Sequence, residues 1–231
     1  MSYINFRGVS TESLAGVAVS KMPSHKRAAM RYTEYYVQGR DGALHIDEGY
    51  SNMELEAQLV LIDAAAETRQ LVNAWAQGTG KLILSDDPSK AYRASVKKEI
   101  KWTRTRGNKG FYDTARIMFD CEPYMYEAAE SVLTVTETQT ISNPGTAVAL
   151  PKIVVTGSGN ATFTIGGKQV TISNMSSSVP VTLDCENGYI FADSGAMSMT
   201  GEFPEIPLGV STITVGSGVT SLEISPQWRW L

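Results

Sequence analysis

The sequence is poor in the residues from which most active sites are built. It has two cysteines, Cys121 and Cys185, and two histidines, His25 and His45, in 231 residues. The cysteines lie far apart in apolar or acidic surroundings, so two buried free thiols are expected rather than a disulfide. No paired metal-ligand spacing exists, and neither histidine lies in a setting typical of a nucleophile and its base. The sequence therefore predicts no catalytic residue, no cofactor and no metal, and it indicates that the chain is not an enzyme.

Long apolar runs and an excess of positive charge are also missing. No apolar stretch approaches the ~20 residues needed to cross a bilayer, and the first residues lack the basic-then-apolar pattern of a signal peptide. We expect a protein made in the cytoplasm without membrane insertion. The 20 Lys and Arg face 24 Asp and Glu, a net charge of −4, which excludes a strongly basic nucleic-acid-binding protein. No sequence-specific contact with nucleic acid is expected.

The residues that are present divide the chain into two parts of different composition. Residues 1–130 hold 17 Lys and Arg against 17 Asp and Glu, whereas 131–231 hold 3 against 7 and so carry the whole net charge of −4. Ser and Thr make up 27 of the last 101 residues, a composition typical of short strands joined by tight turns. Two domains are predicted, 1–130 and 131–231, and the aromatic end 222–231 is also suited to pack back on the first domain.

Periodicity predicts that the first domain is mainly β. Residues 53–61 alternate apolar and polar side chains, as in a half-buried strand. A hairpin is expected over 32–46, because Asp41-Gly42 supplies the positive φ angles that a tight turn requires. Further strands are predicted within 81–84, 92–105 and 111–121.

One helix is predicted in this domain, between the strand 53–61 and the strand 81–84. Asp63 is placed to cap its N-terminus and Gly78 to end it. Its apolar positions follow the helical repeat at Ala64, Thr68, Leu71, Val72 and Trp75. Because Trp75 shares the apolar stripe of the helix, we expect it in the core rather than at an interface.

The second part is predicted to consist of short strands without helices. Gly166-Gly167 separates two β-prone segments by two residues, the spacing of a tight hairpin. Regularly spaced short strands favour a β-sandwich of jelly-roll type. The expected strands are 132–140, 152–156, 161–165, 168–172, 179–183, 188–191, 211–215 and 219–225.

The sharpest electrostatic feature is a basic segment, residues 97–109. It carries six cations against Glu99 alone, a local surplus of +5. One explanation of this surplus is a solvated hairpin with long basic side chains. The other is a positive surface that faces an acidic partner, or a channel through which nucleic acid passes. The spacing leaves both interpretations open for these candidate residues: Lys97, Lys98, Lys101, Arg104, Arg106 and Lys109.

An ordered series of short motifs runs over nearly the whole chain. It resembles the distal tail proteins of long-tailed phages that infect Gram-positive bacteria, which are components of the siphophage tail tip and baseplate. The motifs that carry this resemblance are 6–10 (FRGVS), 19–24 (VSKMPS), 38–47 (QGRDGALHID), 80–88 (GKLILSDDP), 92–96 (YRASV), 143–145 (NPG), 153–159 (IVVTGSG), 201–204 (GEFP), 207–209 (PLG) and 226–230 (PQWRW).

The resemblance implies both a fold and an architectural role. The fold is mainly β, with an N-terminal β-sandwich or barrel-like domain that carries one α-helix and a protruding hairpin, and a C-terminal galectin-like jelly-roll β-sandwich. Six copies would form a ring at the distal end of the tail tube and leave a channel for DNA. The implied partners are other copies of the chain, the tail tube protein and the tail-associated lysin or tip protein. Receptor-binding or other baseplate proteins would bind the second domain, and the location would be the tail tip of the virion.

A different class of function is kept as the alternative. The β-sandwich at 131–225 would then act as a carbohydrate-binding module that recognises the host cell wall. Likeness to galectins does not itself supply a sugar site, which needs an exposed aromatic platform and convergent polar groups. Tyr189, Phe191 and Phe203 fit a core as well as such a platform, and Tyr189 and Phe191 are the positions whose replacement would test sugar binding.

Overall fold

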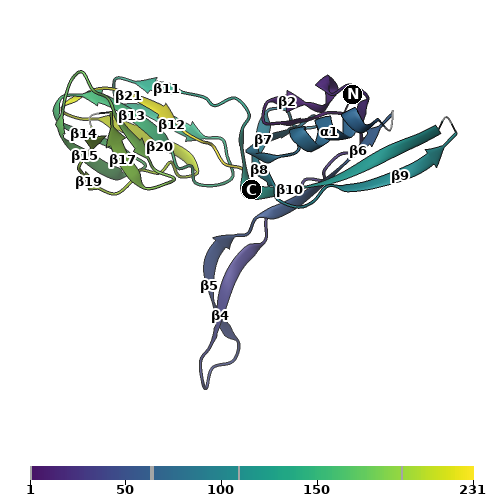
Figure 1. The fold of residues 1–231 in the computed structure, drawn as a ribbon. Helices are drawn as coiled ribbons and strands as arrows, with labels where there is room; N and C mark the ends of the chain where they lie inside the picture. Colours follow the sequence, from purple (N-terminus) through teal and green to yellow (C-terminus); the bar gives the residue numbers. More distant parts are fainter. Residues whose placement is uncertain (1, 63–64, 109, 194) are drawn as a thin grey trace. The chain divides into compact units, whose positions relative to one another are not determined.

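The computed structural model describes residues 2–62, 65–108, 110–193 and 195–231. The chain divides into two compact units, Met1–Ala128 with Leu231, and Ala129–Trp230 (Figure 1). The aromatic end 222–231 was also considered suited to pack on the first domain. Its side chains Trp228 and Trp230 instead pack in the hydrophobic core of the second unit. Within the described residues, no helix is long and apolar enough to span a membrane.

The first unit is built on one antiparallel sheet with the strand order β2-β1-β7-β8-β10-β6-β3, and β9 pairs with β10. A short 3-10 helix, Thr11–Ser13, follows β2. The strands are β1 (Ile4–Phe6), β2 (Val9–Ser10), β3 (Val17–Lys21), β6 (Met53–Leu61), β7 (Gly78–Leu84), β8 (Lys90–Val96), β9 (Lys101–Gly107) and β10 (Gly110–Glu127).

Strand β10 organises this sheet because it pairs with three others. Its first half lies between β9 and β6, and its second half pairs with β8 from Asp120 to Glu127, with a register shift between Cys121 and Met125. The strand β6 has the bounds predicted from its alternation, and every second side chain from Met53 to Leu61 is buried. The region 92–105 holds two strands, β8 and β9, which end and begin on either side of 97–100.

Helix α1 (Ala66–Trp75) packs on this sheet and buries Thr68, Val72 and Trp75. Trp75 forms edge-to-face contacts with Phe6 and Phe119, with ring centroids 6.1 and 6.2 Å apart, and its indole Nε1 donates to the carbonyl oxygen of Val9 at 2.9 Å. The prediction that Trp75 lies in the core is confirmed.

Two details of the predicted helix turn out differently. Leu71 is exposed, so its expected place on the buried stripe is wrong. Gly78, the expected terminator, has a positive φ of 78° but lies in β7, and the helix ends before it at Trp75. The predicted cap Asp63 and the first apolar position Ala64 lie outside the described residues.

Two further strands of the first unit form a separate hairpin, which we call the arm. It consists of β4 (Met30–Tyr36), β5 (Ala43–Tyr50) and the loop 37–42. In the part of the chain that the structure describes, these strands pair only with each other, as Figure 1 shows. The arm confirms the hairpin expected over 32–46, and Gly39 and Gly42 supply positive φ angles at its tip.

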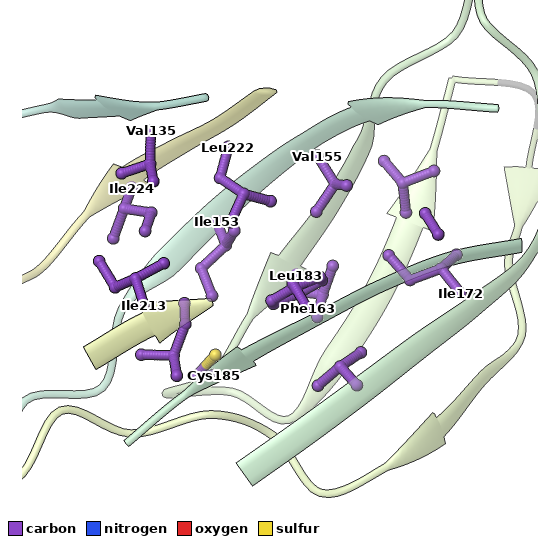
Figure 2. Close-up of a cluster of buried hydrophobic side chains, with 14 of the residues drawn as sticks. Val135, Ile153, Val155, Phe163, Ile172, Leu183, Cys185, Ile213, Leu222 and Ile224 are labelled. Atoms are coloured by element: carbon purple, nitrogen blue, oxygen red, sulfur yellow. The ribbon is translucent and has the colours of Figure 1, made fainter. Parts of the chain in front are cut away.

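The second unit is a sandwich of two antiparallel sheets, with strand orders β11-β21-β13-β16-β17-β18 and β12-β20-β14-β15-β19. Its core is made from the inward side chains of both sheets (Figure 2). The strands are β11 (Leu133–Val135), β12 (Gln139–Asn143), β13 (Lys152–Gly157), β14 (Gly159–Ile165), β15 (Lys168–Met175), β16 (Val181–Asp184), β17 (Tyr189–Ala192), β18 (Gly195–Ala196), β19 (Met199–Gly201), β20 (Gly209–Val215) and β21 (Val219–Ser225).

The mainly β fold class with one α-helix and a protruding hairpin is thus confirmed for the described residues. The hairpin at Gly166-Gly167 also forms as predicted, with φ angles of 59° and 82°. The single strand expected at 132–140 is wrong. It is two strands, β11 and β12, which belong to different sheets, so the chain crosses the sandwich between them.

Candidate functional site

The basic segment does not form one continuous surface. Lys97 and Lys98 lie in the connection between β8 and β9, and the cations from Lys101 to Arg106 lie on β9. Successive side chains of a strand point to opposite faces, so Lys101 lies on the sheet face opposite to that of Arg104 and Arg106. Lys109, the sixth candidate, lies outside the described residues.

Three of the cations are held by carboxylates from neighbouring strands. Lys97 Nζ forms an ion pair with Asp120 Oδ2, and Lys98 Nζ with Glu54 Oε1. Arg104 Nε donates to Asp113 Oδ1 at 2.9 Å. Within the described residues, Lys101 and Arg106 form no ion pair. The local surplus of positive charge in the sequence is therefore largely neutralised by acidic residues of β6 and β10.

Lys101 belongs to a row of polar side chains that crosses three strands. Lys101, Arg116 and Gln58 occupy facing positions on β9, β10 and β6, and Thr103 faces Thr114 one step along. We call this row, Gln58, Lys101, Thr103, Thr114 and Arg116, the polar face. It lines a surface hollow of about 330 Å³. Short hydroxyl and long cationic side chains make this surface polar.

The polar face continues along β10 into two further hollows. One, of about 370 Å³, is lined by Lys98, Glu99 and Met118 beside Lys101 and Arg116. The next is lined by the two ion pairs of Lys97 and Lys98 described above. Cations and carboxylates therefore alternate along this side of the sheet rather than forming a block of one sign.

Asp113 is a buried carboxylate on the opposite face of the sheet, and the sequence pattern gave no sign of it. Its side chain is 4% exposed and accepts from Arg104 through both oxygens, while Arg69 of α1 approaches Oδ2 at 3.4 Å. The hydrogen bonds from the Arg104 guanidinium lower the pKa of the Asp113 carboxyl despite its burial, which opposes ionisation. This carboxylate thus ties the helix and the β9–β10 hairpin together.

The two histidines are part of structural contacts. His25 Nδ1 lies 2.9 Å from Tyr92 Oη and His25 Nε2 lies 3.0 Å from Asp86 Oδ2, so the loop before the arm is joined to the turn between β7 and β8. Burial raises the pKa of Tyr92 to about 12, which leaves the hydroxyl protonated at neutral pH. His45 lies on the arm, 3.8 Å from Glu34. Among the described residues there is no group of three His, Cys, Asp or Glu side chains that could hold a metal ion.

Both cysteines are free and buried, as predicted. Burial raises the pKa of each thiol to about 12. The thiolate is the reactive form of cysteine, so neither side chain is suited to act as a nucleophile.

The two faces of the arm differ in chemistry. One face carries Tyr32, Glu34 and Tyr36 opposite His45 and Asp47, and its side chains contact one another. Tyr36 Oη donates to Glu34 Oε2 at 2.8 Å, and the rings of Tyr32 and His45 lie 5.1 Å apart.

The other face, which we call the apolar arm face, carries Tyr35, Leu44 and Ile46 together with Thr33, whose hydroxyl donates to Glu48 Oε1. Tyr35 lies opposite Leu44, and Ile46 lies opposite Thr33. These three large side chains are 52%, 40% and 55% exposed.

The second unit exposes one pair of aromatic side chains on β17. Tyr189 and Phe191 are both exposed, and their ring centroids lie 5.6 Å apart with the planes tilted by 37°. Asp184, whose carboxylate is held by the backbone and side-chain nitrogens of Asn187 at 2.9 and 3.0 Å, lies directly opposite Tyr189. A hydrogen bond to this carboxylate raises the pKa of the Tyr189 hydroxyl.

Comparison with known proteins finds similar structures but no similar sequences. No family profile and no curated protein sequence matches the chain. Among solved structures, the Dit protein of phage SPP1 matches with a TM-score of 0.76 and 14% identity over 100% of both chains. The chain has the Dit fold.

That structure is described as a paradigm of the hub of the adsorption apparatus in phages that infect Gram-positive bacteria. The expected resemblance to distal tail proteins is confirmed at the level of the fold. Two structures of the activated phage P2 baseplate, with Ca and with Sr, match over 97% and 96% of the chain with TM-scores of 0.47 and 0.43 and 10% identity, too weakly to support an argument.

Proposed function

We propose that this chain is a structural protein of a phage tail tip. Six copies form a ring at the distal end of the tail tube and connect the tube to the host-adsorption apparatus. The observation that carries this proposal is the match to the Dit hub, which covers both chains from end to end and so includes both units. The exposed arm supports it, because a hairpin whose strands, among the described residues, pair only with each other is suited to bind between subunits.

The polar face is proposed to line the channel of this ring, through which DNA passes. The three hollows along this side of the sheet are lined by four cations and three carboxylates, a net +1 per copy. Such a wall attracts DNA weakly without holding it, since each additional phosphate contact strengthens binding and its dependence on salt.

The proposed partners follow the order of a tail. The tail tube protein adjoins the ring on one side and the tail-associated lysin or tip protein on the other, at the tail tip of the virion. The second unit is the proposed attachment site for receptor-binding or other baseplate proteins. No chemical step is assigned to the chain, whose role is mechanical.

The first experiment measures assembly of the full chain. Light scattering coupled to size-exclusion chromatography should give about 151 kDa, six times the chain mass of 25.1 kDa, and negative-stain images should show rings. A single 25.1 kDa species at every concentration tested, also when mixed with the tail tube and tip proteins, would contradict the proposal.

The channel assignment has its own test, in which the charge of Lys101 is reversed. Lys101→Glu changes the polar side of the sheet from net +1 to net −1 per copy. Wild-type rings should retain double-stranded DNA weakly at low ionic strength, and Lys101→Glu rings should lose this retention. Arg27→Glu is the matched control, because Arg27 is exposed and does not line any of the three hollows on this side of the sheet. Equal retention by all three rings would place the channel elsewhere.

A carbohydrate-binding module remains the second candidate, favoured by Tyr189 and Phe191. Two exposed aromatic rings on one sheet face, with a hydrogen-bonded carboxylate beside them, are suited to contact the apolar face of a sugar. Tyr189→Ala and Phe191→Ala should then abolish pull-down by host cell-wall glycans, whereas Val210→Ala, a change at another exposed apolar side chain of this unit, should not. Wild-type protein that binds no glycan would remove this candidate.

A further inference from the structure

The arm is a two-stranded hairpin that adds no strand to the main sheet of its unit. Its two strands pair only with each other, and an isolated two-stranded hairpin is marginally stable in water. Both outer strand edges carry unpaired backbone groups, which are ready to pair with another chain. On the apolar arm face, the large side chains of Tyr35, Leu44 and Ile46 are all exposed. Single exposed apolar side chains are ordinary, but a contiguous group of them marks an interaction surface.

We infer that the apolar arm face docks on a second copy of this chain. The inference rests on the proposed ring and names the contact that holds it together. The opposite arm face is excluded as the principal contact because its groups already satisfy one another. Glu34 accepts from Tyr36, and His45 lies against Tyr32 and Glu34.

The surface that receives the arm is present on the first unit itself. Ile62 and Phe111 are each more than half exposed and line one hollow of about 280 Å³ at the tip of the β9–β10 hairpin. Arg106 lies directly opposite Phe111 on β9. This hollow therefore offers apolar side chains together with a cation.

Charge favours a second copy as the occupant. Residues 30–50, which include the arm, hold two Arg against four Asp and Glu, a net charge of −2. Among the described residues, Asp41 and Asp47 of the arm form no ion pair, and neither does Arg106 beside the hollow. One copy therefore carries an acidic apolar arm and an apolar hollow beside a cation, and the charges named on these two surfaces form no ion pair within the described residues.

A contact between two different surfaces has a geometric consequence. It leaves a free arm on one copy and a free hollow on the other, so further copies add head to tail. Such heterologous contacts close into a ring when the rotation between neighbours fits, and otherwise grow into filaments. The arm contact thus explains how a chain of this size forms a closed collar.

The first test removes apolar groups from one arm face at a time. Leu44→Ser with Ile46→Ser should raise the concentration at which half of the chains are assembled by at least tenfold. Tyr32→Ser with Tyr36→Ser changes two exposed side chains on the opposite face and should raise it less than threefold. Hydrogen exchange of β6 and β10 must match the wild type in both variants, which shows that the unit itself is folded. Equal weakening by the two pairs, or by neither, would overturn the inference.

The second test locates the contact by cross-linking. Leu44→Cys together with Phe111→Cys should give disulfide-linked species up to six chains under mild oxidation, since the native cysteines are buried. Tyr36→Cys together with Phe111→Cys should give none. Rings that form without a cross-link in the first variant would overturn the arm contact and leave the proposed ring intact. A wild-type chain that never assembles would overturn both.

Discussion

Asp113 and Asp120 are two ion-paired carboxylates that differ in burial, so replacing each of them tests how much burial adds to the contribution of an ion pair to stability. Both lie on β10, and both are paired with a cation, but they point to opposite faces of the sheet. The Asp113 side chain is 4% exposed and the Asp120 side chain 23%. Replacing Asp113 by Asn should destabilise the first unit by about 2–3 kcal/mol, because hydrogen bonds to a charged group contribute about 1.5–3 kcal/mol each and Arg104 can partly rehydrate. Asp120→Asn removes a surface ion pair and should cost at most about 1 kcal/mol.

The assay is hydrogen exchange of the slowest amides in β6 and β10, which reports the first unit separately from the second. Each 1.4 kcal/mol is a factor of ten in the opening equilibrium. Asp113→Asn should therefore speed the exchange of these amides roughly 30- to 150-fold, and Asp120→Asn less than about sixfold.

The pH dependence of this difference follows from the direction of the pKa shift. Hydrogen bonds from Arg104 hold the pKa of Asp113 below its usual value in the folded chain. The stabilisation is then complete above the unfolded value of about 3.9 and is lost as the pH falls through the lower folded pKa. The gap between wild type and Asp113→Asn should persist from neutral pH down to about pH 4 and close below it. Similar exchange rates in the two Asn variants, or a gap that closes near pH 6, would refute the reasoning.

Three further predictions concern the cores. Phe6→Ala, which removes the ring packed 5.2 Å from Phe119, should destabilise the first unit by about 3–5 kcal/mol in the same exchange assay. In the second unit, Gly166→Ala should lower the thermal midpoint more than Gly167→Ala, because a Cβ at 166 would lie 2.1 Å from a backbone carbonyl oxygen whereas one at 167 meets nothing within 4 Å; equal shifts would contradict this. Cys121 and Cys185 should resist a thiol reagent at pH 8 until the chain is denatured, since burial raises both pKa values to about 12, and fast labelling of the native protein would show that a core opens.

Elements with a local cause could be predicted from the sequence. The alternation over 53–61 marks one buried face of β6, and Gly166-Gly167 permits the two positive φ angles of a tight turn. The single strand predicted over 132–140 was wrong because β-prone residues run on there without a turn signal. The break there is set by the sandwich, which needs β11 and β12 in different sheets. The crossing between the two sheets could therefore not be predicted from the composition of this segment.

The surroundings of the basic segment could not be predicted, because they depend on strand register. The partners of Lys98 and Arg104 are Glu54 and Asp113, which come from β6 and β10. Only the pairing of these strands brings the charges together. Likewise, the contact of His25 with Tyr92 spans 67 positions, and nothing in the sequence around His25 indicates it.

The ion pairs bear directly on whether this sheet can border a DNA channel. If all six cations of the basic segment faced DNA, six copies would present a dense positive ring that binds phosphates strongly and slows transit. Because Lys97 and Lys98 are neutralised by Asp120 and Glu54, the proposed ring would keep few unpaired charges, chiefly one Lys101 per copy. A surface that is hydrated and nearly balanced in charge permits passage, whereas a uniformly basic one favours retention. The pairing of charges along β10 therefore supports a channel wall better than the sequence surplus does.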